Sequence, residues 1–450
     1  MGKKYTVGCK QLDTEGKGIV SFNGRTFSVP FFLDGEKGTI SLVYGRNETT
    51  ARMEEILKAS PDRVNPECPY YMQCGGCDLM HMTYEKQLLV KQGHVLSALS
   101  KRIEADKPEI LPMLSADEPF RYRNKIHSTF AVQGGKVVGG LYAESTHRLM
   151  PLPEGCRIEP EEAAKIVRTI CRFADSHSIS VYDEDRRKGI LRHVLIRISS
   201  GGDIMVVPVV AEKIFPKKRA LAEAIVKNHP AVKTVVLNYN PAATTMVLGE
   251  KEEVLFGEGY ITETLCGCTF RISPRSFFQV NTKQAEKLFA TAVTFAGIKE
   301  GEQVIDAYCG TGTIGILAAK SAPGAAITGV ELNEDAVRDA RSNAERNGLK
   351  NASFVCADAG KYLSAAAAEG KKADVLFLDP PRSGSTPEFL KAVSKIRPER
   401  IVYISCNPDT LARDLELLKG YKLTKVCAAD MFCQCRHVES IVLLNQRRQA

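Results

Sequence analysis

The sequence predicts a chain of three parts, the largest of which is a doubly wound α/β domain. From about residue 270 onward, short apolar strands alternate with helices, which is typical of a parallel sheet covered by helices. Residues 1–60 consist instead of short strands broken by glycines, and residues 120–260 mix strand-like and helix-like segments. A length of 450 residues is enough for two to four domains.

The N-terminal region is predicted to form a small OB-like β-barrel. Strand-like runs lie at 18–22, 26–30 and 38–43, with turn residues between them. Barrels of this kind often bind oligonucleotides, but they also occur as packing modules without a ligand. The pattern leaves both interpretations open.

A loop at 61–78 carries three closely spaced cysteines, Cys68, Cys74 and Cys77, among prolines and glycines. In a reducing compartment such cysteines are thiols, metal ligands or catalysts rather than disulfides. Their spacing suits thiolate ligation of zinc or of an iron–sulfur cluster, with Cys156 as the best fourth ligand. Spacing alone does not separate the two metals.

The middle of the chain is predicted to combine helices and strands in an α+β arrangement. A helix is expected at 84–102, and strands are expected at 191–197 and 234–237. Residues 120–125 interleave aromatic and basic side chains, which suits single-stranded RNA held by phosphate contacts and base stacking. An ordinary amphipathic strand would give the same pattern.

Composition favours a polyanionic partner without proving one. The formal net charge is +8, the hydrophobic fraction is 44% and the charged fraction is 25%. No apolar run is long enough to span a bilayer or to act as a signal peptide. We therefore expect a cytoplasmic, monomeric protein with no membrane partner.

The α/β part carries polar residues at the ends of successive strands. Strands are predicted at 304–308, 326–330, 354–357, 375–378, 401–405 and 441–444. Residues 306–313, which end at Thr313, form a glycine-rich turn into a helix, where the backbone can approach a ligand closely. Glu331 is placed to accept hydrogen bonds from ribose hydroxyls, and Asp358 could flank an adenine. Each carboxylate alone is more often a helix cap or a solvated residue, but together they favour a nucleotide-like ligand.

Cys406 follows the strand at 401–405, and Glu439 precedes the strand at 441–444. A thiolate at a strand end can add to C6 of a uracil and make C5 nucleophilic towards a methyl donor. A base must then remove the C5 proton, and Glu439 is the best candidate. Taken singly, such residues are more often a packed cysteine and a solvated glutamate.

Several motifs together resemble those of a known family. Residues 304–381 are similar to a class I S-adenosylmethionine (SAM)-dependent methyltransferase. The motifs at 276–281, 379–382, 405–414 and 437–439 resemble the signature set of the RNA uracil-C5 methyltransferases. One departure is that Cys433 and Cys435 stand in the stretch where the family usually has a proline and a threonine, and we interpret both as loop thiols.

The resemblance implies a role for each matching residue. Cys406 is implied to be the nucleophile and Glu439 the base. Phe277 would stack on the target base. Gln279 would contact both the substrate and the bound cofactor. The other residues implied for the SAM and substrate pocket are Tyr308, Glu331 and Asp379. Thr313 and Asp358 are expected in the cofactor site from their positions, at the glycine-rich turn and at a strand end.

The ribosomal-RNA branch of this family has an N-terminal TRAM domain and a [4Fe–4S] cluster. The resemblance implies a TRAM domain at 1–60. It also implies a cluster-bearing central domain at 61–78 and 116–265, and a methyltransferase domain at 79–115 and 266–450. The cluster ligands would be Cys68, Cys74, Cys77 and Cys156. We expect SAM as methyl donor and 23S ribosomal RNA as substrate; the alternatives are a tRNA uracil-C5 methyltransferase and an RNA-binding protein with an inactive methyltransferase domain.

Overall fold

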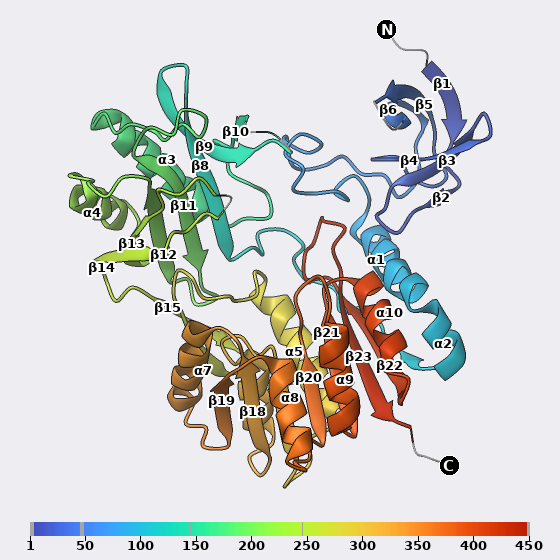
Figure 1. Ribbon diagram of the computed structural model, residues 1–450. Helices are drawn as coiled ribbons and strands as arrows, with labels where there is room; N and C mark the ends of the chain where they lie inside the picture. Colours follow the sequence, from blue (N-terminus) through green and yellow to red (C-terminus); the bar gives the residue numbers. More distant parts are fainter. Residues whose placement is uncertain (1–3, 46–48, 145, 147, 245, 448–450) are drawn as a thin grey trace. The chain divides into compact units, whose positions relative to one another are not determined.

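The computed structural model describes residues 4–45, 49–144, 146, 148–244 and 246–447 (Figure 1). Within it the chain forms two compact units. The first unit comprises residues 1–119, 381–385 and 403–449, and the second comprises 120–380 and 386–402. In the described part of the chain, no helix is both long and apolar enough to cross a membrane.

The first unit begins with six strands in two three-stranded sheets, ordered β1-β5-β6 and β2-β3-β4. The strands are β1 (Lys4–Gly8), β2 (Gln11–Leu12), β3 (Gly18–Phe22), β4 (Arg25–Val29), β5 (Lys37–Tyr44) and β6 (Thr49–Lys58). Both sheets bury alternate apolar residues in one core, as strand periodicity requires. The predicted N-terminal strands are therefore confirmed as β3, β4 and β5.

The rest of the first unit comes from opposite ends of the sequence. Its elements are α1 (Tyr84–Ala98), α2 (Ser100–Asp106), β7 (Glu109–Ile110), α10 (Pro408–Leu417), β22 (Tyr421–Ala429) and β23 (Glu439–Gln446). The single helix predicted at 84–102 is two helices that meet at Leu99. Helix α1 is anchored by Lys91, whose buried ammonium pairs with the buried Asp430 and donates to the carbonyl of Phe432 at 3.0 Å.

The second unit contains a seven-stranded sheet with the order β10-β9-β8-β11-β12-β13-β14. Its strands are β8 (Lys125–Gln133), β9 (Lys136–Tyr142), β10 (Leu149–Pro151), β11 (Leu191–Ile198), β12 (Ile204–Val210), β13 (Val232–Tyr239) and β14 (Lys251–Phe256). Helices α3 (Glu161–Ser176) and α4 (Lys218–Asn228) bury their apolar stripes against one face of this sheet. This part of the chain was predicted to be α+β, and the structure shows this sheet with two helices packed on one face.

The second unit also holds most of the α/β part, preceded by the hairpin of β15 (Ile261–Leu265) and β16 (Cys268–Ile272). The strands that follow are β17 (Gln303–Ala307), β18 (Ala326–Glu331), β19 (Ala352–Cys356), β20 (Val375–Leu378) and β21 (Arg400–Ser405). The helices are α5 (Thr282–Ala296), α6 (Thr313–Ser321), α7 (Glu334–Arg346), α8 (Ala359–Ala368) and α9 (Pro387–Ile396).

These strands belong to an eight-stranded sheet ordered β19-β18-β17-β20-β21-β23-β22-β7. The pairs β17–β18, β18–β19 and β17–β20 are parallel, whereas β22 and β23 are antiparallel. Strands β18 and β19 lie on one side of β17, whereas β20 and β21 lie on its other side. The strand order therefore reverses at β17, so the carboxyl end of this strand is a topological switch point. The doubly wound α/β prediction is therefore confirmed.

Candidate active site

A glycine-rich turn joins β17 to α6 in the second unit. Tyr308 (φ 64°), Gly310 (φ 53°) and Gly312 (φ 82°) all lie in the left-handed region. A Cβ on Gly312 would come within 2.8 Å of the Phe354 ring, whereas a Cβ on Gly310 would meet nothing within 4 Å. The turn therefore packs tightly at Gly312 and leaves open space beside Gly310, which suits a ligand close to the backbone.

Three acidic residues surround this turn. Asp306 is fully buried, and its Oδ2 accepts the amide of Gly315 at 2.8 Å. Glu331 accepts the amide of Gly310 at 3.1 Å through Oε2. Burial raises the pKa of Asp306 to about 8, and the nearby carboxyls of Asp379 and Glu331 add to this effect. Burial likewise raises the pKa of Asp379 to about 7, although this residue is only half-buried.

The chemistry of these residues fits SAM, which carries a sulfonium, an ammonium and two ribose hydroxyls. Oδ1 of Asp306 is buried and has no hydrogen-bond partner in the described structure. A cluster of carboxyls that includes an unpaired buried oxygen, near a turn with open space at Gly310, is suited to a cationic ligand that donates hydrogen bonds. The role of Asp306 was not predicted, since a carboxylate inside a strand gives no distinct sequence signal.

Asp358, Tyr308 and Thr313 are further residues predicted for the cofactor site in this unit. Asp358 is exposed and caps α8, with its Oδ1 accepting the amide of Lys361 at 2.9 Å. The helix-cap interpretation therefore holds for this residue, and contact with adenine stays a prediction. The Tyr308 ring packs at 5.0 Å from the ring of Phe389, and Thr313 is the first residue of α6.

The loop before α5 presents one phenylalanine to solvent and buries the next. Phe277 is 69% exposed, whereas Phe278 is 5% exposed and packs against Phe270. Asn124 fixes the loop, because its side-chain amide donates to the carbonyl of Gln279 at 2.9 Å and its backbone amide donates to that of Val280 at 2.8 Å. A rigid loop with one exposed aromatic ring is suited to base stacking.

The aromatic and basic segment at 120–125 is mostly occupied with internal contacts. The Arg121 guanidinium donates to the carbonyls of Cys156 and Glu159, both at 2.9 Å. Arg123 donates through Nε to the carbonyl of Lys125 at 3.1 Å. Arg121 therefore holds the chain near residue 159, and RNA binding by the segment stays a prediction.

Cys406 lies between the end of β21 and the start of α10, in the first unit. It is half-buried. The following Asn407 caps α10, since its Oδ1 accepts the amides of Asp409 at 3.0 Å and Thr410 at 3.4 Å. The amides at a helix start favour a nearby anion, so the position suits a thiolate.

Asp414 is a positioning residue that the sequence did not reveal. It is fully buried on α10, and one oxygen accepts both the amide of Ser385 at 2.7 Å and the hydroxyl of Tyr403 at 2.6 Å. The other oxygen accepts Nε of Arg413 at 2.9 Å. These bonds fix residues 381–385, which follow Asp379, to the helix that follows Cys406.

Glu439 is the first residue of β23 and is 4% exposed. It lies opposite Ala429 in the antiparallel pair with β22. Two residues earlier, Nδ1 of His437 lies 3.5 Å from the Arg382 guanidinium, and burial together with Arg382 and Arg436 lowers the pKa of His437. A buried carboxylate has the restricted setting that a catalytic base needs.

The loop before Glu439 packs against the cysteine loop. Cys435 donates from Sγ to the carbonyl of Gly76 at 2.9 Å, and Asp78 accepts the amide of Arg436 at 3.1 Å. Cys433 and Cys435 lie in the loop as thiols, and both are buried rather than exposed to solvent. The stretch that departs from the family pattern is therefore part of the contact between these two loops.

The four cysteines predicted to ligate a cluster are divided between the two units. Cys68, Cys74 and Cys77 lie in the first unit, whereas Cys156 lies in the second. Across the described ranges, no three His, Cys, Asp or Glu side chains are arranged to hold a metal ion. Burial raises the pKa of the Cys74 thiol, and the neighbouring Cys68 and Cys435 contribute to the rise. The structure therefore gives no support to a [4Fe–4S] cluster on these residues, and the cluster stays a prediction.

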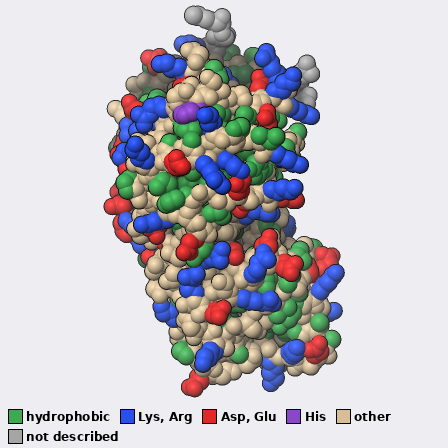
Figure 2. Space-filling view, turned by 90° about the vertical axis from the view of Figure 1, so that its left-hand side faces the viewer, with side chains coloured by type: hydrophobic (Ala, Val, Ile, Leu, Met, Phe, Trp, Pro, Cys, Tyr) green, Lys and Arg blue, Asp and Glu red, His purple; other side chains and the backbone are tan. Residues whose placement is uncertain are grey.

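Two hollows lie outside these sites. A groove of about 800 Å³ on the strand-rich N-terminal region is lined by Lys17, Thr26, Phe27, Ser28, Pro30, Phe31, Thr49, Thr50, Ala51, Arg52, Met53 and Met72. It combines cationic, aromatic and hydroxyl side chains. Figure 2 shows lysines and arginines interspersed with acidic residues, rather than gathered in a single patch, on the face that it draws.

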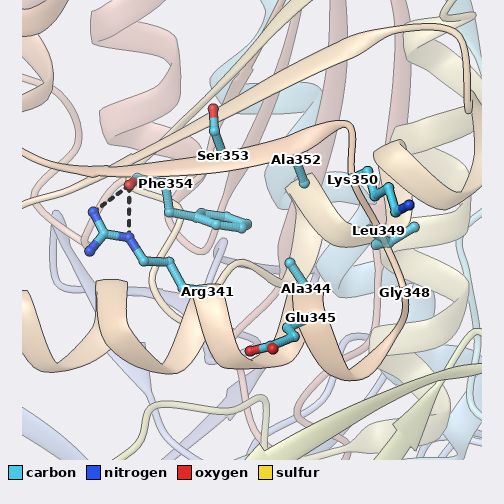
Figure 3. Close-up of a pocket in the computed structure, with 9 residues that line it drawn as sticks. All are labelled: Arg341, Ala344, Glu345, Gly348, Leu349, Lys350, Ala352, Ser353 and Phe354. Carbon is cyan, nitrogen blue, oxygen red and sulfur yellow. Dashed lines mark hydrogen bonds between the residues drawn. The ribbon is translucent and has the colours of Figure 1, made fainter.

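The second hollow, of about 450 Å³, lies at the edge strand β19 (Figure 3). Arg341 on α7 donates to the carbonyl of Phe354 at 3.1 Å and 2.7 Å. This contact covers part of the exposed edge of the sheet, which would otherwise be open to pairing. None of the predicted site residues lines this hollow.

Comparison with known proteins places these features in a family. The profile of the tRNA (uracil-5-)-methyltransferase family matches residues 220–447. An uncharacterized RNA methyltransferase of Halalkalibacterium halodurans is 39% identical over 97% of this chain and 96% of its own. One from Caldanaerobacter subterraneus is 37% identical over 99% of both chains.

Among solved structures, the chain is similar to a tRNA (uracil-54, C5)-methyltransferase of Pyrococcus abyssi in complex with S-adenosyl-L-homocysteine. That similarity has a TM-score of 0.78 and 27% identity, and it covers 98% of this chain and 100% of the other. The expected class I SAM-dependent methyltransferase fold is confirmed. The chain therefore belongs to the RNA uracil-5-methyltransferase family.

Proposed function

We propose that the protein transfers a methyl group from SAM to C5 of a uridine in structured RNA, with Cys406 as the nucleophile. The observation that carries this proposal is a half-buried Cys406 at a strand end, together with a buried Glu439, in a chain of this family. An inactive RNA-binding role is less well supported, because both residues that the chemistry needs are present.

The proposed reaction has three steps. The Cys406 thiolate adds to C6 of the uracil, and the C5–C6 electron pair moves into the C4 carbonyl as an enolate. C5 then takes the methyl group of SAM, which leaves S-adenosylhomocysteine. Glu439 removes the C5 proton, the C5–C6 double bond re-forms, and the thiolate leaves C6.

The second unit would hold the cofactor. When bound, SAM supplies an electrophilic methyl group. Glu331 would accept hydrogen bonds from the ribose, and Asp306 and Asp379 would stabilise the cationic part of the ligand. Gln279 and Tyr308 complete the pocket that the family resemblance implies. The fixed loop would hold the exposed Phe277 ready to stack on the target base once the base has left its helix.

The N-terminal region would supply affinity for RNA. We propose that it is a TRAM domain and that its groove, which includes Lys17, Phe31 and Arg52, contacts the backbone and bases of RNA. Phosphate contacts of this kind weaken steeply with salt.

We propose 23S ribosomal RNA as the substrate, on the resemblance of the cysteine loop and the N-terminal region to the ribosomal branch. A specific observation supports tRNA as the second candidate: the Pyrococcus abyssi tRNA enzyme aligns with 98% of this chain, including the N-terminal region. Either RNA agrees with a cytoplasmic protein. A monomer remains the expectation for its assembly.

The iron–sulfur cluster remains only a prediction from resemblance, and we derive no chemical step from it. Iron and zinc analysis of anaerobically purified protein would test it. About four irons per chain would support ligation by Cys68, Cys74, Cys77 and Cys156. A metal-free, colourless and active enzyme would remove the prediction.

The function is tested by combining purified protein, methyl-labelled SAM and total RNA, followed by nucleoside analysis of separated 23S RNA and tRNA. Labelled 5-methyluridine is the expected product. Mapping of 5-methyluridine in a deletion strain then identifies the RNA. A label at another base, or no label in any RNA, would contradict the proposal.

A further inference from the structure

Strands β8 and β11 of the second unit place cationic side chains on one face of their sheet. In this antiparallel pair Lys125 lies directly opposite Arg197, and His127 lies opposite Leu195. Lys125 and His127 share a face because alternate residues of a strand point the same way. Like charges that lie directly opposite each other destabilise a sheet, so this pairing calls for an interaction that offsets the repulsion.

These groups are close together and poorly solvated. Burial lowers the pKa of Lys125 to about 8, with Arg197 and Arg123 contributing. Burial lowers the pKa of His127 to about 4, and Lys125, Arg123 and Arg197 lower it further. Arg197 is 3% exposed, and burial alone lowers its pKa to about 10.

The cluster has no counter-charge of its own. Among the residues that the structure describes, no acidic side chain forms an ion pair with Arg123, Lys125 or Arg197. Glu159 lies near Arg123, but burial raises its pKa to about 7 and thus reduces its charge at neutral pH. Nε of Arg197 and Nε2 of His127 are buried without hydrogen-bond partners. The low pKa of His127 leaves its ring neutral at neutral pH, so Arg197 is the buried cation. A buried cation without an ionic partner is costly unless an anion completes the site.

The cluster adjoins the loop that would hold the target base. Arg197 donates a hydrogen bond to the carbonyl of Ser276, next to Phe277. Asn124, between Arg123 and Lys125, holds Gln279 and Val280. An anion bound here would therefore lie close to the segment that carries Phe277.

We propose that Arg123, Lys125, His127 and Arg197 form a binding site for a phosphodiester of the RNA, close to the target uridine. The site rests on the proposed function, because it takes RNA as the substrate. Arg197 and His127 supply buried donors, Lys125 supplies the mobile charge, and the Ser276 contact ties the position of the phosphate to that of Phe277. The cluster thereby sets which nucleotide reaches the stacking ring.

The test is Lys125→Gln, with Lys136→Gln as the matched control, because Lys136 is exposed on the neighbouring strand β9. RNA affinity is measured over a range of salt concentrations with a structured RNA that the wild type methylates. Lys125→Gln should weaken binding at low salt by about 10- to 100-fold, as for loss of a charged hydrogen bond. The slope of log affinity against log salt should fall by about 0.7, the value for one phosphate of a single strand. The control should keep the wild-type slope.

A second measurement separates a phosphate site from a structural role. Lys125→Gln should raise the unfolding temperature, because it removes repulsion from Arg197, whereas a structural lysine would lower it. An RNA with uncharged methylphosphonate linkages, scanned across the nucleotides that flank the target, should bind the wild type more weakly at one position and Lys125→Gln equally at all positions.

Unchanged affinity and salt slope in Lys125→Gln, or equal loss for both proteins at every methylphosphonate, would overturn the phosphate site. If the wild type methylates the RNA while these results hold, only the phosphate site fails. If the wild type neither binds nor methylates RNA, the proposed function fails and the phosphate site fails with it.

Discussion

The carboxylate of Asp414 accepts the backbone amide of Ser385 at 2.7 Å. Asp414 lies on the helix that follows Cys406, and Ser385 lies in the turn that follows the Asp379 motif. The same carboxylate oxygen accepts the hydroxyl of Tyr403, which lies on the strand that leads to Cys406. Two motifs that are separate in sequence thus depend on one buried carboxylate.

We expect Asp414→Asn to lower the free energy of unfolding by about 1–3 kcal/mol, because a charge-assisted set of hydrogen bonds loses its anion. The rate of methyl transfer should fall as residues 381–385 shift. Thermal unfolding and single-turnover assays measure both effects. Asp409→Asn, whose side chain is 73% exposed on the same helix, is the control. Equal stability of the two variants would refute the positioning role.

Cys406→Ala should abolish methylation while leaving S-adenosylhomocysteine binding intact, because the cofactor residues belong to the second unit and the nucleophile does not. Calorimetry measures cofactor binding, and labelled SAM measures turnover. Turnover by the alanine variant would rule out covalent addition at C6.

Glu439→Gln should trap a covalent protein–RNA adduct that is already methylated at C5. Loss of the base blocks removal of the C5 proton but not attack by Cys406. A denaturing gel should therefore show a slow band that requires both RNA and SAM, and that disappears in the double variant with Cys406→Ala. Normal product release would assign the base to another residue.

The raised pKa of Asp379 predicts two pH dependences. The pKa is about 7 in the folded protein against an ordinary value of 3.8, so the folded state binds a proton that the unfolded chain releases. The free energy of unfolding should consequently fall as the pH rises between these two pKa values, and it should fall less in Asp379→Asn. Asp306, whose pKa is about 8, contributes in the same direction in both proteins.

SAM is cationic, so its binding should favour ionised Asp379 and release protons. Affinity should increase between pH 6 and pH 8 in the wild type and change less in Asp379→Asn. Calorimetry in buffers of different ionisation enthalpy detects the protons. Binding without proton release at pH 7 would contradict this role.

Lys91→Met should lower the free energy of unfolding by about 3–5 kcal/mol, because it leaves Asp430 buried without its cation. Lys101→Met on the exposed face of α2 should have little effect. Chemical denaturation compares the two variants. A loss below about 1 kcal/mol would show that water or Tyr84 compensates for the lysine.

The sequence predicted the α/β elements closely because their signals are local. Helix α6 and strand β20 occupy the predicted residues, since a glycine turn and an apolar run define each without help from distant residues. The helix break at Leu99 was missed, because the apolar stripe continues across it. Glu331 and Cys406 could be singled out as candidate site residues for the same reason. Glu331 ends an apolar strand, and Cys406 directly follows one.

Long-range contacts could not be predicted in this way. Cys435 bonds to Gly76 across 359 positions, and no local pattern links them. The cation cluster was also missed, because Lys125 and Arg197 meet only through strand register. The three cysteines at 68–77 are close in sequence, but among the described residues no group of three potential ligands is arranged to hold a metal ion, so the cluster stays a prediction.

The assembly of the first unit from both ends of the chain has a consequence for protein synthesis. Helix α1 and the cysteine loop emerge early, but their partners Asp430, Gln434 and Arg436 are translated between 339 and 358 residues later. At about 5–20 residues per second, the early segments wait on the order of half a minute before those partners exist. The unit that carries Cys406 and Glu439 therefore completes its fold only after these late partners have been translated, so a nascent chain that stops short of them cannot form the proposed active site.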